Sequence, residues 1–179
     1  MSQLGRTPLH QSILTEDFPK CRALLAAGAR VDAQDDHGNT PLHNASYHNS
    51  VVAVKLLLAQ PSSREAIALR TTEGDSALDY ACANSHVEVA RALIAAGADV
   101  NAQDERGWGA LHNSCSKFNS KSIELIELLL ESGANSLILN SDGQTPYDIS
   151  REKSVKNLLK ISMDLAQADI DFLDGGMEF

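Results

Sequence analysis

Gly38-Asn39-Thr40-Pro41-Leu42-His43 is the stretch that decides the fold, because the chain repeats it at a regular interval. A close copy, Gly5-Arg6-Thr7-Pro8-Leu9-His10, begins 33 residues earlier, with Gly5 against Gly38. Weaker copies begin at Gly74, Gly107 and Gly143, after spacings of 36, 33 and 36 residues. Five copies at this period indicate a repeat architecture built from one supersecondary unit.

A second pattern ends most of the units. The sequence Leu-Leu-Ala-Ala-Gly-Ala or a close variant occurs at residues 24–29, 93–98 and 129–134, whereas the second unit lacks the glycine. Together the two patterns resemble the ankyrin repeat family, which has Thr-Pro-Leu-His at its first helix and Leu-Leu-x-x-Gly-Ala at the end of its second. The resemblance covers roughly residues 4–160. It implies an all-α repeat solenoid of stacked helix-turn-helix units joined by β-hairpin-like loops.

The units predict how the chain is divided. We expect an ankyrin-repeat domain at residues 1–160, with repeats at about 4–34, 35–70, 71–103, 104–139 and 140–160. Residues 161–179 would form a C-terminal capping helix and an acidic-hydrophobic tail. The fifth unit is short and charged on its outer side, which is typical of the terminal cap of a repeat array. Extra residues around 61–65 and 117–122 are expected to form protruding loops.

Elementary helix chemistry supports the same elements. Thr40 can accept a hydrogen bond from a first-turn N–H, and Pro41 has no N–H to leave unsatisfied at the first helical position. The apolar residues within 51–58 and 89–94 recur at helical spacing, which predicts one buried stripe on each second helix. Gly28, Gly97 and Gly133 are expected to stop helices with a positive φ.

The composition restricts the partners and the location. Of the 179 residues 43% are hydrophobic and 22% are charged, and the net charge is −9. This predicts a folded protein whose surface repels a phosphate backbone, so we expect no nucleic acid partner. No apolar run reaches the roughly 18 residues of a membrane span, and the N-terminus shows no secretory signal. We therefore expect no membrane insertion and a cytoplasmic, and also nuclear, location, as a monomer or a subunit of a hetero-complex.

The histidines favour a structural role over a metal site. His10, His43 and His112 occupy the motif position, where the resemblance implies a hydrogen bond between neighbouring repeats. His37, His43 and His48 belong to one unit, but no carboxylate or thiolate stands at metal-ligand spacing from them. We predict neither a metal site nor a cofactor.

No enzyme is predicted either. Asp79 and Asp148 replace the motif histidine two units apart, which is too far for an acid–base pair. Cys115 follows His112 by three residues, but a histidine engaged at its own helix start is a poor base for a nucleophile. Cys21, Cys82 and Cys115 lack Cys-x-x-Cys spacing, which favours buried thiols over a disulfide framework or a zinc site.

The resemblance places partner contacts on the loop tips and on the exposed side of the first helices. In repeats two to four these positions hold Asp36, His37, Asn39, Tyr47, His48, Thr72, Glu73, Asp75, Asn84, Glu105, Arg106, Trp108, Ser116, Lys117 and Phe118.

Trp108 and the acidic loop tips indicate how such a surface would bind. Trp108 is the single tryptophan, and exposed tryptophans often dominate interface energetics. The alternative is that its ring folds over Gly109 and shields a neighbouring loop. Acids at the tips favour a partner with a basic segment, and the alternative is a solvated acidic rim.

Two further sites remain as hypotheses. Residues 163–179 interleave acids with large apolar residues, so this segment could dock in a partner's groove through Ile170, Phe172, Leu173, Met177 and Phe179. The alternative is a capping helix that ends near Ala168, followed by a frayed end. Asn101 occupies the position that asparaginyl hydroxylases modify in ankyrin repeats, a role that the resemblance alone implies.

These observations predict a non-catalytic protein–protein interaction module or adaptor. It would bind a protein partner through the loop tips and first helices of repeats two to four. The alternative is a regulatory or inhibitory subunit, or an assembly chaperone, of one obligate complex, with the C-terminal tail as a docking peptide.

Overall fold

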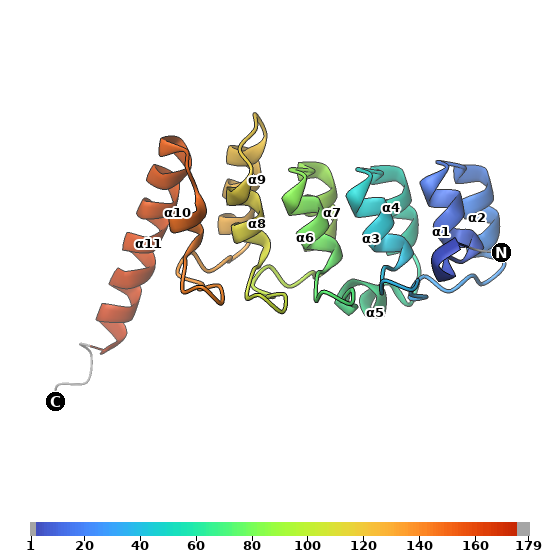
Figure 1. Ribbon diagram of the computed structural model, residues 1–179, viewed down its shortest axis with the longest axis horizontal. Helices are drawn as coiled ribbons and strands as arrows, with labels where there is room; N and C mark the ends of the chain where they lie inside the picture. The colour runs from blue at the N-terminus through green and yellow to red at the C-terminus, as the bar shows by residue number, and fades with distance from the viewer. Residues whose placement is uncertain (1–2, 175–179) are drawn as a thin grey trace.

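The chain folds into a row of helix pairs that stand side by side (Figure 1). The computed structural model describes residues 3–174, with side chains for residues 4–167. The pairs are α1 (Pro8–Leu14) with α2 (Phe18–Ala26), α3 (Pro41–Tyr47) with α4 (Val51–Leu58), α6 (Ala77–Ala83) with α7 (Val87–Ala95), α8 (Ala110–Ser116) with α9 (Ser122–Glu131), and α10 (Pro146–Ile149) with α11 (Lys153–Asp174). A short 3₁₀ turn, η1 (Gln3–Gly5), precedes them. The predicted all-α repeat solenoid is confirmed.

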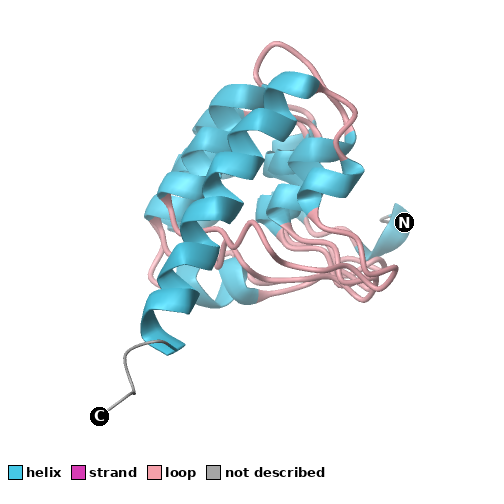
Figure 2. Cartoon of the chain, turned by 90° about the vertical axis from the view of Figure 1, so that its left-hand side faces the viewer, coloured by secondary structure: helices cyan, strands magenta, loops and turns pink. Residues whose placement is uncertain are grey.

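Each repeat covers the apolar flank of its neighbour. The first helices form one layer and the second helices another, and the loops that join one helix pair to the next gather on one side (Figure 2). Among the first helices, α3 packs between α1 and α6, and α8 packs between α6 and α10. Leu42, Leu78 and Leu111 on these helices are at most 2% exposed. The stack therefore buries one continuous core that no single repeat could form alone.

The repeated motif starts the first helix of four of the five repeats with a capping box. Thr40 Oγ1 accepts a hydrogen bond from the His43 N–H over 3.4 Å, and the Thr40 N–H donates to His43 Nδ1 over 3.2 Å. This confirms Thr40 as the N-cap. Gly109 brings no hydroxyl to the fourth repeat. The full capping box recurs at Thr7, Ser76 and Thr145.

The glycines of the second pattern end the second helices as predicted. Gly28, Gly97 and Gly133 have φ of 83°, 95° and 86° and follow α2, α7 and α9. The residue after each glycine donates back into the last turn, as Ala98 N–H does to Leu93 O over 3.0 Å. This arrangement satisfies carbonyls that a helix end leaves free.

The segments that we call tip loops precede the first helices of repeats two to five. They are residues 35–39, 71–75, 104–108 and 140–144, and in each the first residue's N–H donates to the last residue's carbonyl. Neighbouring tip loops are also joined, since Thr72 N–H donates to His37 O over 3.0 Å. Within residues 3–174 the only β-type pairing outside helices is an isolated bridge between Gln103 and Gly109. The tip loops are therefore tight hairpin-like turns that form a continuous ledge.

The insertion after α4 differs from the prediction. We expected a protruding loop around residues 61–65, but Ser63–Ala68 forms a helix, α5. Ala66 is 2% exposed and packs against the core, so the helical conformation buries a side chain that an open loop would leave in water. The insertion at 117–122 is a loop as predicted, with Phe118 50% exposed and α9 beginning at its end.

The last helix pair is unequal. Helix α10 has 4 residues, whereas α11 has 22 and packs against α9 and α10. Val155 and Leu159 are buried on its inner side. The prediction that the last helix ends near Ala168 is wrong, because α11 continues to Asp174. Residues 161–174 contain no glycine or proline, which are the residues that most disfavour a helix.

We predicted a division between the repeat domain and the C-terminal segment after residue 160. Helix α11 is continuous there and does not mark this division, which stays a prediction. Among the described helices, none is both long and apolar enough to cross a bilayer.

Candidate partner-binding groove

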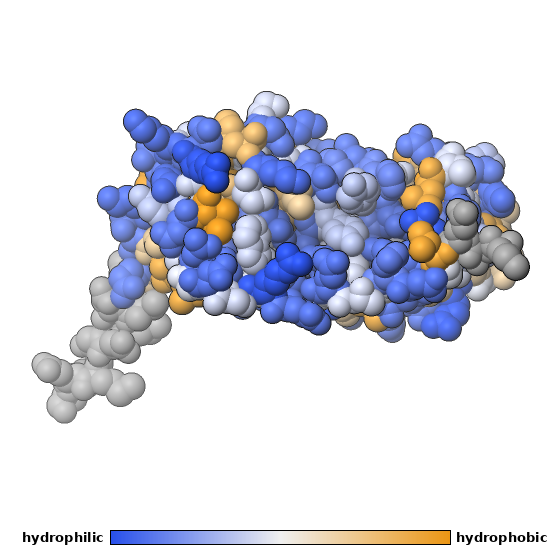
Figure 3. Space-filling view, viewed as in Figure 1, coloured by the Kyte–Doolittle hydropathy of each residue, from blue (hydrophilic) through white to orange (hydrophobic). Residues whose placement is uncertain are grey.

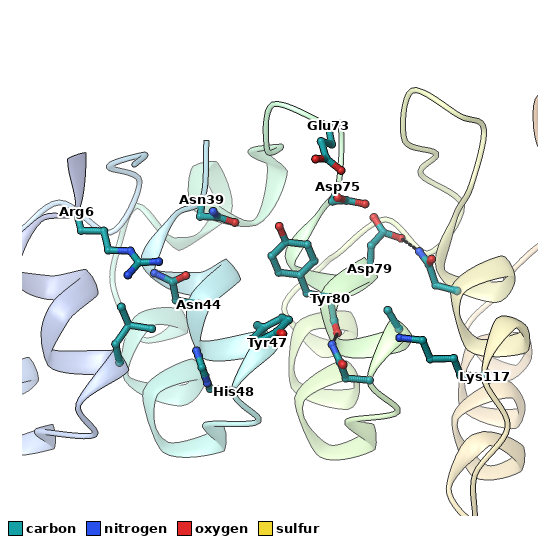
Figure 4. Close-up of a pocket in the computed structure, with 14 residues that line it drawn as sticks. Arg6, Asn39, Asn44, Tyr47, His48, Glu73, Asp75, Asp79, Tyr80 and Lys117 are labelled. Atoms are coloured by element: carbon teal, nitrogen blue, oxygen red, sulfur yellow. Dashed lines mark hydrogen bonds between the residues drawn. The ribbon is translucent and has the colours of Figure 1, made fainter. Parts of the chain in front are cut away.

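A groove of about 500 Å³ crosses the first helices next to the tip loops (Figure 4). The face drawn in Figure 3 is mostly hydrophilic over the central repeats, and hydrophobic side chains gather toward its two ends. A ligand in the groove would touch four repeats at once, because its lining comes from Arg6, Leu14, Asn39, Asn44, Tyr47, His48, Glu73, Asp75, Asp79, Tyr80, Ala83, Asn84, Asn113 and Lys117.

The motif histidines hold the tip loops against the first helices. The His43 Nε2–H donates to the Asp75 carbonyl over 3.2 Å, and His10 and His112 make the same contact with the tip loops that follow them. Burial lowers the pKa of all three imidazoles, that of His43 to about 4. The neutral ring can then accept at Nδ1 and donate at Nε2. The predicted hydrogen bonds between repeats are confirmed.

Asp79 takes the histidine's place in the third repeat and is 2% exposed. Its Oδ2 accepts hydrogen bonds from the Ser76 N–H over 2.9 Å and the Ser76 hydroxyl over 2.6 Å. Its Oδ1 accepts from Asn113 Nδ2 over 3.1 Å, and Arg70 lies 3.7 Å from the carboxylate. Burial raises the pKa of Asp79, while the hydrogen bonds from Ser76 lower it. The carboxylate therefore serves as a helix cap and a link between repeats.

Asp75 lies at the acidic centre of the groove. It is half-buried, and burial together with the negative charges of Asp79, Asp104 and Glu73 raises its pKa to about 6. An opposite charge nearby favours the ionised form of a carboxylate. A positive group that approaches Asp75 would therefore lower its pKa again.

Two tyrosines form an aromatic wall beside these acids. The Tyr47 and Tyr80 rings have their centroids 6.0 Å apart at an interplanar angle of 71°. Tyr80 also meets the buried His43 ring edge-on at 5.6 Å, which holds it in place. Burial, with the nearby charge of Asp75, raises the pKa of Tyr80 to about 12. Tyr47 is 55% exposed and can meet a ligand directly.

The cysteines are buried, unpaired and poorly suited to nucleophilic chemistry. Burial raises the pKa of the Cys115 thiol to about 12, and that of Cys82 is raised further. Reactivity requires the thiolate form. His112 is engaged at both ring nitrogens, since Nδ1 accepts the Gly109 N–H and Nε2 contacts Gln144 O. In the part of the chain with described side chains, no group of three His, Cys, Asp or Glu could hold a metal ion.

Comparison with known proteins agrees with this architecture. A family profile described as ankyrin repeats (3 copies) matches residues 1–67 and 19–104. The chain belongs to the ankyrin repeat family.

Three relatives illustrate the range of ankyrin repeat proteins that it is similar to. Ankyrin repeat and SOCS box protein 3 of Bos taurus is 31% identical over 73% of this chain and 31% of the relative. The nuclear factor NF-kappa-B p105 subunit of Gallus gallus is 34% identical over 89% of this chain and 16% of the relative. NF-kappa-B inhibitor alpha of Gallus gallus is 32% identical over 96% of this chain and 54% of the relative. The chain thus spans at most about half the length of these relatives. Ankyrin repeats are non-catalytic protein-interaction modules.

The groove brings together about half of the predicted contact residues. Those that line it are Asn39, Tyr47, His48, Glu73, Asp75, Asn84 and Lys117. Exposed on the tip loops are Asp36, His37, Thr72, Glu105 and Arg106, and exposed beyond the groove are Ser116 and Phe118. His37 and Thr72 also line a smaller hollow between the second and third repeats. Their role in binding stays a prediction.

Several groove residues were absent from the prediction. Asn44, Tyr80 and Asn113 each directly follow the motif residue of their ankyrin repeat. Equivalent positions of stacked repeats lie side by side, so the register of the repeats carried a signal that would have found them. Arg6 holds in the first repeat the position that Asn39 holds in the second, so the same register marks it, although the predicted surface began at repeat two.

Trp108 agrees in part with each of its two predicted roles, contact with a partner and packing against its own chain. Trp108 is half-buried, its ring lies 5.8 Å from the His112 ring, and its backbone N–H donates to Asp104 Oδ1 over 2.7 Å. Trp108 is not part of the groove lining. The exposed portion of the ring leaves a contact with a partner as a prediction.

The remaining hypotheses concern the C-terminal tail and Asn101. Ile170, Phe172 and Leu173 belong to α11, but their side chains lie outside the described ones, and Met177 and Phe179 lie outside the described residues altogether. Asn101 is exposed and bridges two repeats, since its Nδ2 donates to Gly133 O over 3.0 Å and its Oδ1 accepts from Asn135 N–H over 2.7 Å.

Proposed function

We propose that this ankyrin repeat chain is a non-catalytic adaptor that binds a protein partner through the tip loops and first helices of repeats two to four. The observation that carries the proposal is the groove of about 500 Å³, whose lining holds three acids, the cations Arg6 and Lys117, and the exposed Tyr47. Aromatic side chains at the centre of a concave surface are the groups on which interface energy usually concentrates.

A non-enzymatic role is part of the proposal. The two candidate reactive groups are otherwise engaged, since His112 holds a tip loop and burial raises the pKa of Cys115 to about 12. Retained function after Cys115→Ser would support it, whereas loss of function without loss of folding would contradict it.

A second candidate is a regulatory or inhibitory subunit of one complex. Similarity to a protein named NF-kappa-B inhibitor alpha extends over 96% of the chain. The two candidates differ in stoichiometry, because an obligate subunit co-purifies with one assembly at a fixed ratio and an adaptor does not. Sedimentation of the endogenous protein distinguishes them.

The test of the binding surface is affinity capture with the full chain and matched variants. Tyr47→Ala removes the exposed aromatic group of the groove, and Trp108→Ala compared with Trp108→Phe separates contact from packing against His112. Val52→Ala on α4 is the control, since this side chain is 44% exposed on the layer of second helices. We expect the partner to be lost with Tyr47→Ala and kept with Val52→Ala. Equal capture by both variants would place the binding surface elsewhere.

The C-terminal segment and the location are proposed on sequence grounds. A chain ending at Ala168 tests whether Ile170 to Phe179 dock into a partner, and unchanged capture would remove that role. For the location, free buried cysteines suit the reducing cytoplasm or nucleus, and imaging of the tagged chain tests it. Mass spectrometry of the native protein tests hydroxylation at Asn101, with one added oxygen as the expected result.

A further inference from the structure

The two halves of the groove offer different chemistry to a ligand. One half contains the carboxylates of Glu73 and Asp75 beside Tyr80, and the other contains the amides of Asn39 and Asn44 next to the guanidinium of Arg6 (Figure 4). Lys117 also lines the groove, at the fourth repeat. A binding partner must therefore supply a positive group at one point and hydrogen-bonding groups at another.

Asp75 is available to a cation from outside. Among residues 4–167 no cation lies within ion-pair distance of its carboxylate. Arg70 contacts Asp79 at 3.7 Å, and Arg106, whose charge partly offsets that of the acids around Asp75, contacts Glu73 at 3.9 Å. Burial, and after it the charges of the neighbouring acids, raises the pKa of Asp75 to about 6. An incoming positive charge would relieve this repulsion.

The aromatic wall makes a planar cation a better fit than a compact one. Tyr80 is held by His43, and Tyr47 stands 6.0 Å from it with more than half of its side chain exposed. A guanidinium group stacks on aromatic rings and presents paired N–H donors to a carboxylate. A lysine ammonium is more strongly hydrated and lacks the planar fork.

Asn44 provides a second, independent sign of a ligand. It lines the groove and is 7% exposed, and its Nδ2 finds no hydrogen-bond partner among the described residues. Asn113 holds the same position two repeats later and donates to the carboxylate of Asp79. For Asn44, the residue of the preceding repeat that corresponds to Asp79 is His10, and the Nε2–H of His10 already donates to Asn39 O. A buried amide donor without an acceptor is costly, so this N–H is suited to an oxygen supplied by a ligand.

We propose that the groove binds an extended basic segment of a protein partner, whose arginine guanidinium pairs with Asp75 against Tyr47 and Tyr80, and whose main-chain carbonyl accepts from Asn44 Nδ2. This inference rests on the proposed function, because it specifies the chemistry of the segment that the same surface takes. A peptide meets both requirements, since it carries a carbonyl at every residue beside its side chain.

The test is a titration of the full, ¹⁵N-labelled chain with short peptides, followed by NMR chemical shifts at pH 7.5. The probes are acetyl-Gly-Gly-Arg-Gly-Gly-amide and the same peptide with citrulline or lysine in place of arginine. Citrulline keeps the shape of arginine and removes its charge. We expect the arginine peptide to shift the Asp75, Tyr80 and Asn44 resonances, and the citrulline and lysine peptides to bind about 10-fold and about 3-fold more weakly.

Three variants complete the experiment. Asp75→Asn should weaken the arginine peptide about 10-fold, and Asn44→Leu, which keeps the volume and removes the donor, about 3-fold. Asp142→Asn is the matched control, because Asp142 is an exposed tip-loop acid outside the groove lining. It should change the affinity less than 2-fold, as distant charges are screened. Circular dichroism of each variant checks the fold.

Equal binding of the citrulline peptide, an unaffected Asp75→Asn variant, or no shift at Asp75 up to about 10 mM arginine peptide would overturn the inference. A native partner that depends on Tyr47 but binds Asp75→Asn normally would also overturn it while leaving the proposed function intact. Capture of the native partner by Tyr47→Ala as well as by the original chain would instead contradict the proposed function.

Discussion

Asn113 donates a hydrogen bond from Nδ2 to Asp79 Oδ1 over 3.1 Å, and this bond ties the fourth repeat to the buried carboxylate of the third. The link depends on aspartate at a position where the other central repeats carry histidine. Asp79 also receives two hydrogen bonds from Ser76 and lies near Arg70.

Removal of the Asp79 carboxylate should therefore destabilise the stack. We expect Asp79→Ala to lower the free energy of unfolding by about 3 kcal/mol, because it leaves buried donors without an acceptor. Asp148→Ala is the control, since Asp148 caps its helix in the same way but is exposed, and it should cost about 1 kcal/mol. Urea unfolding measures both, and equal losses would show that the bond to Asn113 contributes little.

The burial of His43 predicts a loss of stability in acid. Its pKa in the folded state is lowered to about 4 from the ordinary 6.5, so the folded protein binds fewer protons than the unfolded chain. The resulting stability is fully present above pH 6.5 and is lost as the pH falls toward 4. The difference corresponds to about 3 kcal/mol. Unfolding curves between pH 7.5 and 4.5 should show a flatter pH dependence for His43→Gln, and an unchanged slope would contradict this origin.

Two glycines with similar backbone conformation should differ in tolerance to a side chain. Gly28 and Gly38 have φ of 83° and 76°. A Cβ at Gly28 meets nothing within 4 Å, whereas one at Gly38 would lie 2.8 Å from the Thr72 backbone nitrogen. Gly28→Ala should cost about 1 kcal/mol from backbone strain alone. Gly38→Ala should cost about 3 kcal/mol, because it also separates two tip loops. Thermal unfolding compares them, and equal costs would mean that the loops adjust freely.

Two leucines of helix α11 should contribute differently to the stability of the stack. Leu159 is fully buried and Leu165 is 63% exposed, on the same helix. Leu159→Ala should lower the free energy of unfolding by about 3 kcal/mol through the cavity that it leaves. Leu165→Ala should change it by less than about 0.5 kcal/mol. A large effect of Leu165→Ala in the isolated chain would indicate that this side chain is covered in solution.

The repeat architecture, the starts of the first helices and the glycine stops were predictable because they depend on local chemistry. Thr40 and Pro41 specify a helix start from their own hydrogen-bonding properties, and Gly28 ends a helix because it adopts a positive φ at little cost. The motif histidines were also predictable, since their register recurs with the period of the stack. The helix at residues 63–68 was missed because the burial of Ala66 depends on neighbours that the local sequence does not reveal.

The sequence by itself determined the repeat, the starts of the first helices, the glycine stops of three second helices and the candidate ledge, since each follows from interactions within one or two units of the chain. Only the tertiary structure decided that Asn44, Asp75, Tyr47 and Tyr80 line one groove, that Asp79 has Asn113 as a partner, and that Asn44 Nδ2 has no hydrogen-bond partner among the described residues. The reason is that these relationships join side chains of different repeats. Stacking geometry, which no single repeat contains, sets the distances between them.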